Sequence, residues 1–426
     1  MKAGKWFFAF LATFAALLIL QLPKISQVQL DFNLRHNEIC ASHERIDPFR
    51  VWDGQVESEK YIGRRRPDRP QPGPLLPGQR MVHAYPPWHT TFFYFYGWIP
   101  NRTAAVAFKV FNLALLAAML VGLVRFCAQR KLSVPKTCFV AASVCLYFHS
   151  QIRLCIGIGN YGVLLAALAV LLFRFLDRGR QVPAGIVWAL MMIKPQVSAL
   201  LFWPLLFGKC YRAILVAAGI CFAATLFPAW LYGESPLELV LQVPRIGAPY
   251  CLHGNFCGPF LRLARLFLGE ASLGLTAAFF FLLGGLISFP ARHCGKWWEK
   301  TIPAMIVVPY WTYAQRMDWV IAWNVVLATS LLAVGDRSIP FPRHLRHALA
   351  AVWFIVLPLA FATDSPIQKA GDLLLHGAWL VSVFVLWRFQ ASRDAVTSAD
   401  SAAPLPSGGN PIRCGQSADD APPEAL

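Results

Sequence analysis

The sequence predicts an all-α polytopic membrane protein with about ten transmembrane helices. Of its 426 residues, 57% are hydrophobic and only 14% are charged, and the mean hydropathy is +0.49. A soluble domain is about 45–50% apolar and about 25% charged. The apolar residues form long blocks separated by short segments rich in Lys and Arg, which is typical of membrane helices and their cytoplasmic loops. These loops and anionic lipid headgroups account for the net charge of +17, so we do not expect nucleic acid as a partner.

The first apolar block spans 6–22 and follows Lys2 and Lys5. Because no cleavage site of small residues follows it, we expect an uncleaved first helix whose N-terminus is cytoplasmic. The segment 23–102 is too long for a simple connection, so we expect it to form a first extracytoplasmic loop with a function of its own.

Basic loops set the boundaries of the later helices. They predict spans at 103–124, 137–150, 161–176, 213–232, 271–290, 302–314, 318–335, 344–362 and 370–388. The block 183–208 differs, because Lys-Pro-Gln at 194–196 interrupts it and each half is too short to cross ~30 Å of hydrocarbon. We expect a re-entrant pair of short helices there; a single kinked helix is the alternative and would invert every later loop. Residues 1–389 then form the transmembrane domain, and 390–426, rich in Ala, Ser, Pro and Asp, a disordered cytoplasmic tail.

An acidic residue near the first helix is a candidate general base. Asp31, in QLDFNLRHNE, follows that helix on the outer side of the interface, where a carboxylate can take a proton from a hydroxyl held at the membrane surface. Glu38 and Asp47 in the same loop are rivals, although Asp47 precedes Pro48 and suits a turn. A solvated loop residue or a helix N-cap is the structural alternative for Asp31.

Polar residues in apolar surroundings form a second group of candidates. Ionisable groups at or within a membrane are costly, so they usually pair or line a polar cavity. In the predicted topology the following residues point toward the extracytoplasmic side: Arg153, Asn160, Lys194, Gln196 and Arg316. Pro195 breaks a helix and leaves the Lys194 cation at the tip of the break, where a lipid phosphate is the natural ligand.

Three further outer stretches carry candidate ligands. AYPPWH, before the second helix, contains the interfacial Tyr85 and also His89, which can donate to a phosphate or a sugar. An Arg-rich stretch at 64–69 could hold phosphate, although such runs are more often solvated. Cys251 and Cys257 share an external loop, and whether they form a disulfide is left open.

Several common catalytic motifs are absent from the sequence. It contains no P-loop, no GxGxxG before a helix, no HExxH, no GxSxG and no DxD in a cytoplasmic loop. It also shows no internal repeat. These observations argue against an ATPase, a cytoplasmic nucleotide-sugar enzyme, the commoner hydrolases and a transporter built from inverted halves.

Six short motifs occur in a fixed order between about residues 25 and 320. They are Asp31-Phe32, Asp47-Pro48-Phe49, Tyr85-Pro86-Pro87, the stretch Gly157 to Gly162, Ala184-Gly185 with Lys194-Pro195-Gln196, and Gly254-Asn255. Their order and spacing resemble glycosyltransferase family 87, polytopic GT-C enzymes related to mycobacterial polyprenyl-phosphate-mannose-dependent mannosyltransferases. Two features depart from that pattern: Ile158 or Asn160 replaces a usual Gln, and YWTYAQRMDW is unusually aromatic.

The resemblance implies a GT-C-like bundle that transfers a mannose-like hexose from a polyprenyl-phosphate donor to a lipid or glycan acceptor. Transfer would occur on the extracytoplasmic face of the inner (plasma) membrane, with inversion and without a nucleotide. Asp31 would deprotonate the acceptor hydroxyl, and cations would stabilise the leaving phosphate. Those cations would be Lys194 first, then His89, Arg153 and Arg316. Sugar contacts would come from Tyr85, Asn160, Gln196 and Asn255. The chemistry demands no metal or other cofactor.

Two other classes of protein are compatible with these observations. A lipid-linked glycan ligase or polymerase would need no base at Asp31 but would need an Arg-rich external loop, which 64–69 could supply. A transporter or flippase of polyprenyl-linked sugars would place its substrate residues near the membrane midplane and would show internal symmetry. In the preferred topology, with the re-entrant pair, both termini are expected in the cytoplasm.

Overall fold

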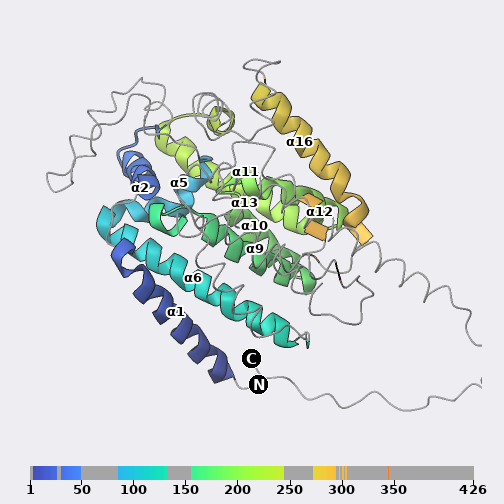
Figure 1. The fold of residues 1–426 in the computed structure, drawn as a ribbon. Coiled ribbons are helices and arrows are strands. Elements are labelled where there is room, and N and C mark those ends of the chain that lie inside the picture. The colour runs from blue at the N-terminus through green and yellow to red at the C-terminus, as the bar shows by residue number, and fades with distance from the viewer. Residues whose placement is uncertain are drawn as a thin grey trace, which may run out of the picture.

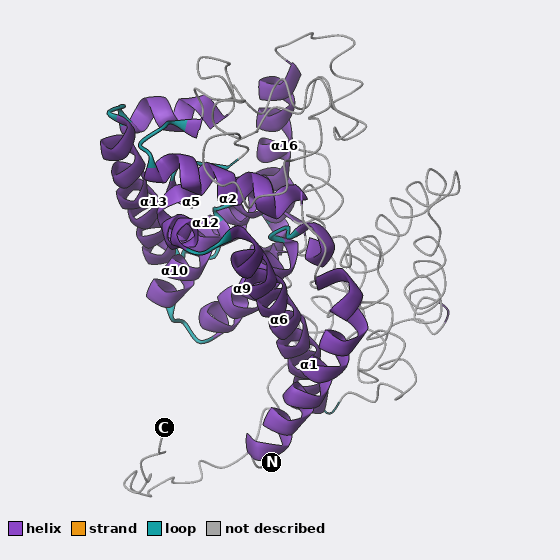
Figure 2. Cartoon of the chain, turned by 90° about the vertical axis from the view of Figure 1, so that its left-hand side faces the viewer, coloured by secondary structure: helices purple, strands orange, loops and turns teal. Residues whose placement is uncertain are grey.

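The computed structural model of the chain describes residues 3–25, 30–48, 85–129, 131, 155–243, 272–293, 297, 300–301, 303–304 and 344. Every regular element in these ranges is a helix, and Figure 2 shows only helices and loops among them. The all-α prediction is therefore confirmed for this part of the chain.

The elements follow one another along the chain as shown in Figure 1. The α-helices are α1 (Ala3–Ile25), α2 (Leu30–His43), α5 (Trp88–Phe93), α6 (Asn101–Gln129), α9 (Gly162–Asp177), α10 (Gln181–Met191), α11 (Pro195–Ser198), α12 (Phe202–Phe207), α13 (Tyr211–Tyr232) and α16 (Ser272–Ser288). The 3₁₀ helices are η1 (Tyr94–Trp98), η2 (Ala199–Leu201) and η4 (Pro290–His293). A further helical segment covers 236–243.

Five predicted spans correspond to described helices. They are 6–22 with α1, 103–124 with α6, 161–176 with α9, 213–232 with α13 and 271–290 with α16. Each is a long apolar block, so the hydrophobic signal alone located it. The predicted span 137–150 and those between 302 and 388 lie outside the described residues, apart from isolated positions.

Two of the described helices are long and apolar enough to cross a membrane. They are Asn101–Gly122, within α6, and Tyr211–Tyr232, each of 22 residues. At 1.5 Å per residue such a helix spans about 33 Å, slightly more than the ~30 Å hydrocarbon core of a bilayer. This supports a membrane protein, whereas the number of about ten spans stays a prediction.

The helices form a bundle around an apolar core. In both views α1 runs beside α6, and α10 packs against α9 on one side and α13 on the other (Figures 1 and 2). Leucines at positions 113, 116, 165 and 200 are almost completely buried in the core between these helices. α16 packs on α12, where the Trp203 indole donates to the Phe281 carbonyl oxygen at 2.8 Å.

The segment 23–102, predicted as a long loop, contains helix α2, helix α5 and η1. Two histidines of α2 attach it to the later part of this segment. His36 Nε2 lies 2.9 Å from the Ile99 carbonyl oxygen, and His43 Nε2 lies 2.9 Å from the Tyr94 carbonyl oxygen. The described parts of this segment, 30–48 and 85–98, therefore pack together at the end of the bundle where α1 ends and α6 begins.

The chain reverses direction at 192–194, the break predicted from the Lys-Pro-Gln sequence. The Trp188 indole in α10 donates to the Ser198 carbonyl oxygen in α11 at 3.0 Å. The Ser198 hydroxyl in turn donates to the Met191 carbonyl oxygen at 2.8 Å. Residues before and after the break thus face each other, as in a helical hairpin.

Both ends of this hairpin lie at the same end of α13. The Arg212 amide, in the first turn of α13, donates to Gln181 Oε1 in the first turn of α10 at 3.2 Å. A Cβ added to Gly185 would lie 2.6 Å from the Ala213 carbonyl oxygen, so α10 and α13 run parallel in close contact. A straight or kinked span between Gln181 and Arg212 would separate these residues by a bundle length, so the geometry favours the hairpin over the kinked helix.

Basic residues gather at the end of the bundle opposite α2 and α5. The last turn of α9 and the turn after it carry Arg174, Arg178 and Arg180, and the turn before α13 and its first turn carry Lys209 and Arg212. α9 and α13 therefore each connect a basic end to an end that meets α2 or α5. This asymmetry is the distribution expected across a membrane whose cytoplasmic side is the basic one.

Candidate functional site

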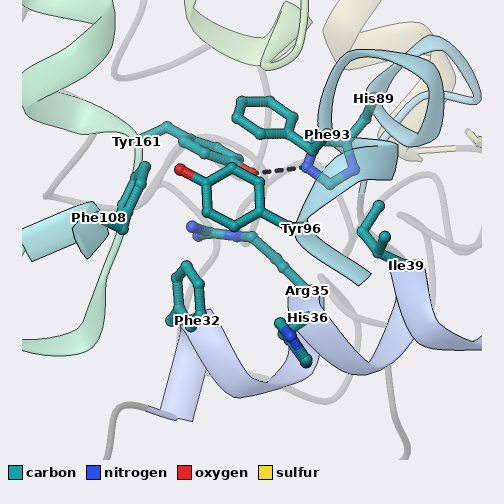
Figure 3. A pocket seen from close by; sticks show the side chains of 9 residues that line it. All are labelled: Phe32, Arg35, His36, Ile39, His89, Phe93, Tyr96, Phe108 and Tyr161. Atoms are coloured by element: carbon teal, nitrogen blue, oxygen red, sulfur yellow. Dashed lines mark hydrogen bonds between the residues drawn. The ribbon is translucent and has the colours of Figure 1, made fainter. Parts of the chain in front are cut away.

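A small cavity lies where α2 meets the 85–98 segment and the start of α9 (Figure 3). Its lining is mostly aromatic or basic: Phe32, Arg35, His36, Ile39, His89, Phe93, Tyr96, Phe108 and Tyr161. The cavity volume is about 10 Å³, roughly the minimum that holds one water molecule. An organic substrate would therefore require these side chains to move apart.

Arg35 lies at the centre of this cluster and is only 4% exposed. Its Nη1 donates to the Gly159 carbonyl oxygen at 2.5 Å. Its guanidinium carbon lies 4.1 Å from the centre of the Tyr161 ring and 4.9 Å from that of Tyr85. A desolvated guanidinium over aromatic rings gains about 2 kcal/mol of electrostatic attraction, so these contacts hold Arg35 in a defined position.

His89 connects the start of α5 to Tyr161. The Pro86 carbonyl oxygen accepts the His89 amide at 2.9 Å, which closes the first turn of this short helix. The imidazole is completely buried and stacks on Tyr85, with ring centres 4.7 Å apart. Its Nε2 lies 2.7 Å from the Tyr161 hydroxyl, the hydrogen bond drawn in Figure 3.

A tight turn before α9 positions Asn160, which is 1% exposed. Gly159 has a φ of +76°, a conformation that a residue with a Cβ adopts only with strain. The Asn160 amide donates to the Cys155 carbonyl oxygen at 2.7 Å, and its side-chain oxygen accepts the Gly162 amide at 3.1 Å. The turn therefore points the Asn160 side chain along the start of α9.

Lys194, 6% exposed, stands at the tip of the hairpin and faces this turn. Its ammonium group lies 3.4 Å from the Asn160 side-chain oxygen. The Trp88 indole of α5 donates to the Met192 carbonyl oxygen at 2.9 Å, which ties the tip to α5. Gln196, also buried, follows in α11.

A second polar group continues along α2. Ser42 and Tyr232 at the end of α13 share a hydrogen bond of 2.6 Å between their hydroxyl oxygens. Glu38, in α2, and Asp47, which follows it, are both buried. The α2 side of the site therefore carries these carboxylates as well as Arg35, whereas the hairpin side carries Lys194.

Burial also affects the titration of Tyr96, one of the two tyrosines that line the cavity. The pKa of Tyr96 is raised because burial disfavours the phenolate. Its hydroxyl thus stays protonated at neutral pH. In the described part of the chain no group of three His, Cys, Asp or Glu side chains is placed to hold a metal ion.

The structure brings several sequence-predicted residues together and leaves others undescribed. Contacts connect Tyr85 to His89 and Asn160 to Lys194, with Gln196 two residues further. Asp31, expected in a loop, is the second residue of α2, one helical turn before Arg35. Three candidates lie outside the described residues: Arg153, Asn255 and Arg316.

Sequence reasoning missed two residues of the cluster, Arg35 and Tyr161. Once 30–43 is helical, positions 31, 35, 38 and 42 share one face at helical spacing and are all polar. This spacing indicates one polar face of a helix, but it does not stand out when 23–102 is predicted to be a loop. Nothing in the local sequence distinguishes Tyr161, since its role comes from partners distant in the chain.

The described part of the chain is an all-helical, membrane-type protein with a buried site that joins cations, hydrogen-bond donors and aromatic rings. The model of glycosyltransferase family 87 matches residues 83–288. The chain is thus a glycosyltransferase, and the class predicted from its motifs is confirmed. The matched region holds Tyr85, His89, Asn160 and Lys194, whereas Asp31 and Arg35 precede it. No curated protein and no solved structure matches the chain.

Proposed function

We propose that this enzyme transfers a mannose-like hexose from a polyprenyl-phosphate donor to a lipid or glycan acceptor on the extracytoplasmic face of the inner membrane. The observation that carries the proposal is the convergence of four motif segments at one buried site. These are the start of α2, the stretch 85–89, the turn 157–162 and the hairpin tip at 194–196.

The hairpin tip is suited to bind the donor phosphate. Lys194 is a cation at a break in a helix, next to the amide of Asn160. When the sugar leaves, the phosphate gains negative charge, and a cation aimed at that charge stabilises the transition state more than the ground state. His89 is a further donor in this cluster, and aromatic rings such as Tyr85 can cover the apolar face of a sugar.

Asp31 is proposed as the general base. Its carboxylate takes the proton of an acceptor hydroxyl while the acceptor oxygen attacks the anomeric carbon. The bond from that carbon to the phosphate oxygen breaks, and polyprenyl phosphate leaves with the bonding electron pair. Attack opposite the leaving group inverts the configuration. Glu38, two turns further along α2 and buried, is the rival base.

The distribution of charge supports an extracytoplasmic site. The cluster lies at the end of α9 and α13 opposite their basic turns, and basic turns are expected in the cytoplasm. In this topology the hairpin 181–210 is re-entrant and brings Lys194 to the outer half of the membrane. The prenyl chain of the donor can then stay in lipid while its phosphate reaches the site.

A transfer assay with the purified full-length chain in detergent tests the proposal. Radiolabelled polyprenyl-phosphate mannose, and then other polyprenyl-phosphate sugars, would be offered with a membrane lipid extract as acceptor. We expect transfer by the wild type and its loss in Asp31→Asn, with Glu38→Gln as the comparison for the rival base. Arg178→Gln, at the exposed basic end, is the control and should keep full activity.

The outcomes separate the alternatives. Transfer that survives Asp31→Asn but not Glu38→Gln moves the base by two turns of α2 and keeps the enzyme class. Absence of transfer with every donor contradicts the proposed donor class. The ligase or polymerase and the flippase would then be tested with lipid-linked oligosaccharide and with vesicles.

A further inference from the structure

Arg35 connects two parts of the site that lie far apart in the sequence. It belongs to α2, the helix that carries the proposed base at position 31, one turn earlier. Its guanidinium donates to the carbonyl oxygen of Gly159, 124 residues further along the chain.

The turn that Arg35 holds is the one that presents Asn160 to the hairpin tip. Gly159 takes a left-handed conformation, and the next residue, Asn160, accepts from Lys194. Lys194 itself is anchored independently, because its carbonyl oxygen accepts from the Ser198 hydroxyl at 3.1 Å and its amide donates to Met191. The backbone at Lys194 is therefore held within the hairpin, and the turn at Gly159–Asn160 lies between it and α2.

The tyrosine rings around Arg35 restrict the orientation of its guanidinium plane. A guanidinium is planar and can stack on Tyr161 and Tyr85 while one edge donates to Gly159. An ammonium group can make the hydrogen bond but cannot match both rings with a plane. The surroundings of position 35 therefore favour arginine over lysine because of the shape of the guanidinium group as well as its charge.

We propose that Arg35 is a positioning residue that sets the distance between the base-bearing helix α2 and the donor-binding turn at Gly159–Asn160. This proposal rests on the proposed function for its kinetic consequences, while its structural consequence is independent of activity. Loss of Arg35 leaves base and cation present but misaligned. A misplacement of about 1 Å lowers the rate of an oriented reaction by about a hundredfold.

The first experiment measures the turn without requiring activity. Cys155 is completely buried, and its carbonyl oxygen accepts a hydrogen bond from the backbone amide of Asn160. The reaction of the Cys155 thiol with N-ethylmaleimide therefore reports opening of the turn. In the full chain, with labelled peptides identified by mass spectrometry, we expect Arg35→Gln to label Cys155 about tenfold faster than wild type. Arg35→Lys should be intermediate.

Controls separate positioning from general loss of structure. Cys221, buried on α13 beside α10, should label at an unchanged rate in both variants. Arg178→Gln should leave both cysteines unchanged. An unchanged Cys155 rate in Arg35→Gln overturns the proposal, and so does an equal acceleration of both cysteines.

The second experiment divides the kinetic effect between binding and chemistry. With the donor on which the wild type is active, we expect Arg35→Gln to lower kcat by about tenfold to a hundredfold and to change the donor KM by less than about threefold. Arg35→Lys should recover part of kcat. A raised KM with unchanged kcat would mean that Arg35 binds the donor directly, and it would overturn the positioning role. A wild type without transfer activity contradicts the proposed function, and the labelling experiment then decides the role of Arg35 alone.

Discussion

At the scale of the residue, two buried asparagines differ in whether their side chains are hydrogen-bonded. Asn160 is buried and its side-chain oxygen accepts from Gly162 and Lys194. Asn112, in α6, is also completely buried, but neither polar atom of its side chain has a hydrogen-bond partner within the described part of the chain. A buried polar group without a partner costs about 1–3 kcal/mol, so the same residue type has opposite energetic effects at the two positions.

Replacing Asn112 by leucine tests this difference. Because Asn112→Leu removes an unsatisfied amide and keeps the volume, we expect the free energy of unfolding to rise by about 1–3 kcal/mol. The measurement is the thermal melting temperature in detergent. Asn160→Leu is the matched comparison and should lower the melting temperature, since it breaks the turn before α9. A lower melting temperature for Asn112→Leu would mean that the amide stabilises the bundle.

Lys194 gives a second prediction at this scale. Lys194→Met removes the charge and keeps most of the apolar chain. We expect transfer to fall by about a hundredfold or more, because the leaving phosphate loses its cation. The melting temperature should not fall, since a buried cation is costly to the fold. Lys131→Met, at an exposed position beyond α6, is the control. A joint loss of activity and melting temperature would instead assign Lys194 a structural role.

At the scale of the element, the close contact between α10 and α13 depends on a glycine, Gly185. A Cβ at Gly185 would meet the Ala213 carbonyl oxygen at 2.6 Å and Val216 Cβ at 2.8 Å. Both neighbours belong to a helix, so they cannot move independently. The two helices can therefore approach closely only with glycine at this position.

Gly185→Ala should accordingly destabilise the protein, by about 1–3 kcal/mol, because it overpacks the helix contact. Gly219→Ala is the matched control, since a Cβ there meets nothing within 4 Å and alanine favours the helix. We expect it to be neutral or to stabilise by up to about 1 kcal/mol. Melting temperatures of the two variants check the pair, and equal effects would mean that the helices separate without cost.

Helix α2 shows how one element changes the reading of its residues. In a loop, Asp31 and Glu38 are unrelated candidates for a base. In a helix they lie seven residues apart on the same face as Arg35. The helical period therefore places Arg35 between the two candidate bases, Asp31 and Glu38, on one face of α2.

At the scale of the whole molecule, the hairpin determines the side of every later loop. If 181–210 is re-entrant, the turns at Arg178 and Arg212 lie on the same side of the membrane. Arg178→Cys and Arg212→Cys, labelled in intact cells and in inverted vesicles with a reagent that does not cross membranes, should both react only in inverted vesicles. Labelling of the two positions from opposite sides would establish the kinked helix and invert the later topology.

The sequence by itself determined the helical class, the positions of five described helices and the break at 194–196. These features depend on local composition, because apolar blocks require burial or lipid and proline interrupts a helix. It also predicted the glycosyltransferase class, since the motifs retain their order along the chain. The same motifs predict Tyr85, His89, Asn160 and Lys194 as site residues, and these roles stay predictions.

Only the tertiary structure decided that these segments meet and that Arg35 lies between them. The hydrogen bond from Arg35 to Gly159 joins residues 124 positions apart, and the hydrogen bond between His89 and Tyr161 joins residues 72 positions apart. It also decided that the chain returns at the hairpin. No local pattern specifies such contacts, because they arise from packing of whole helices against one another.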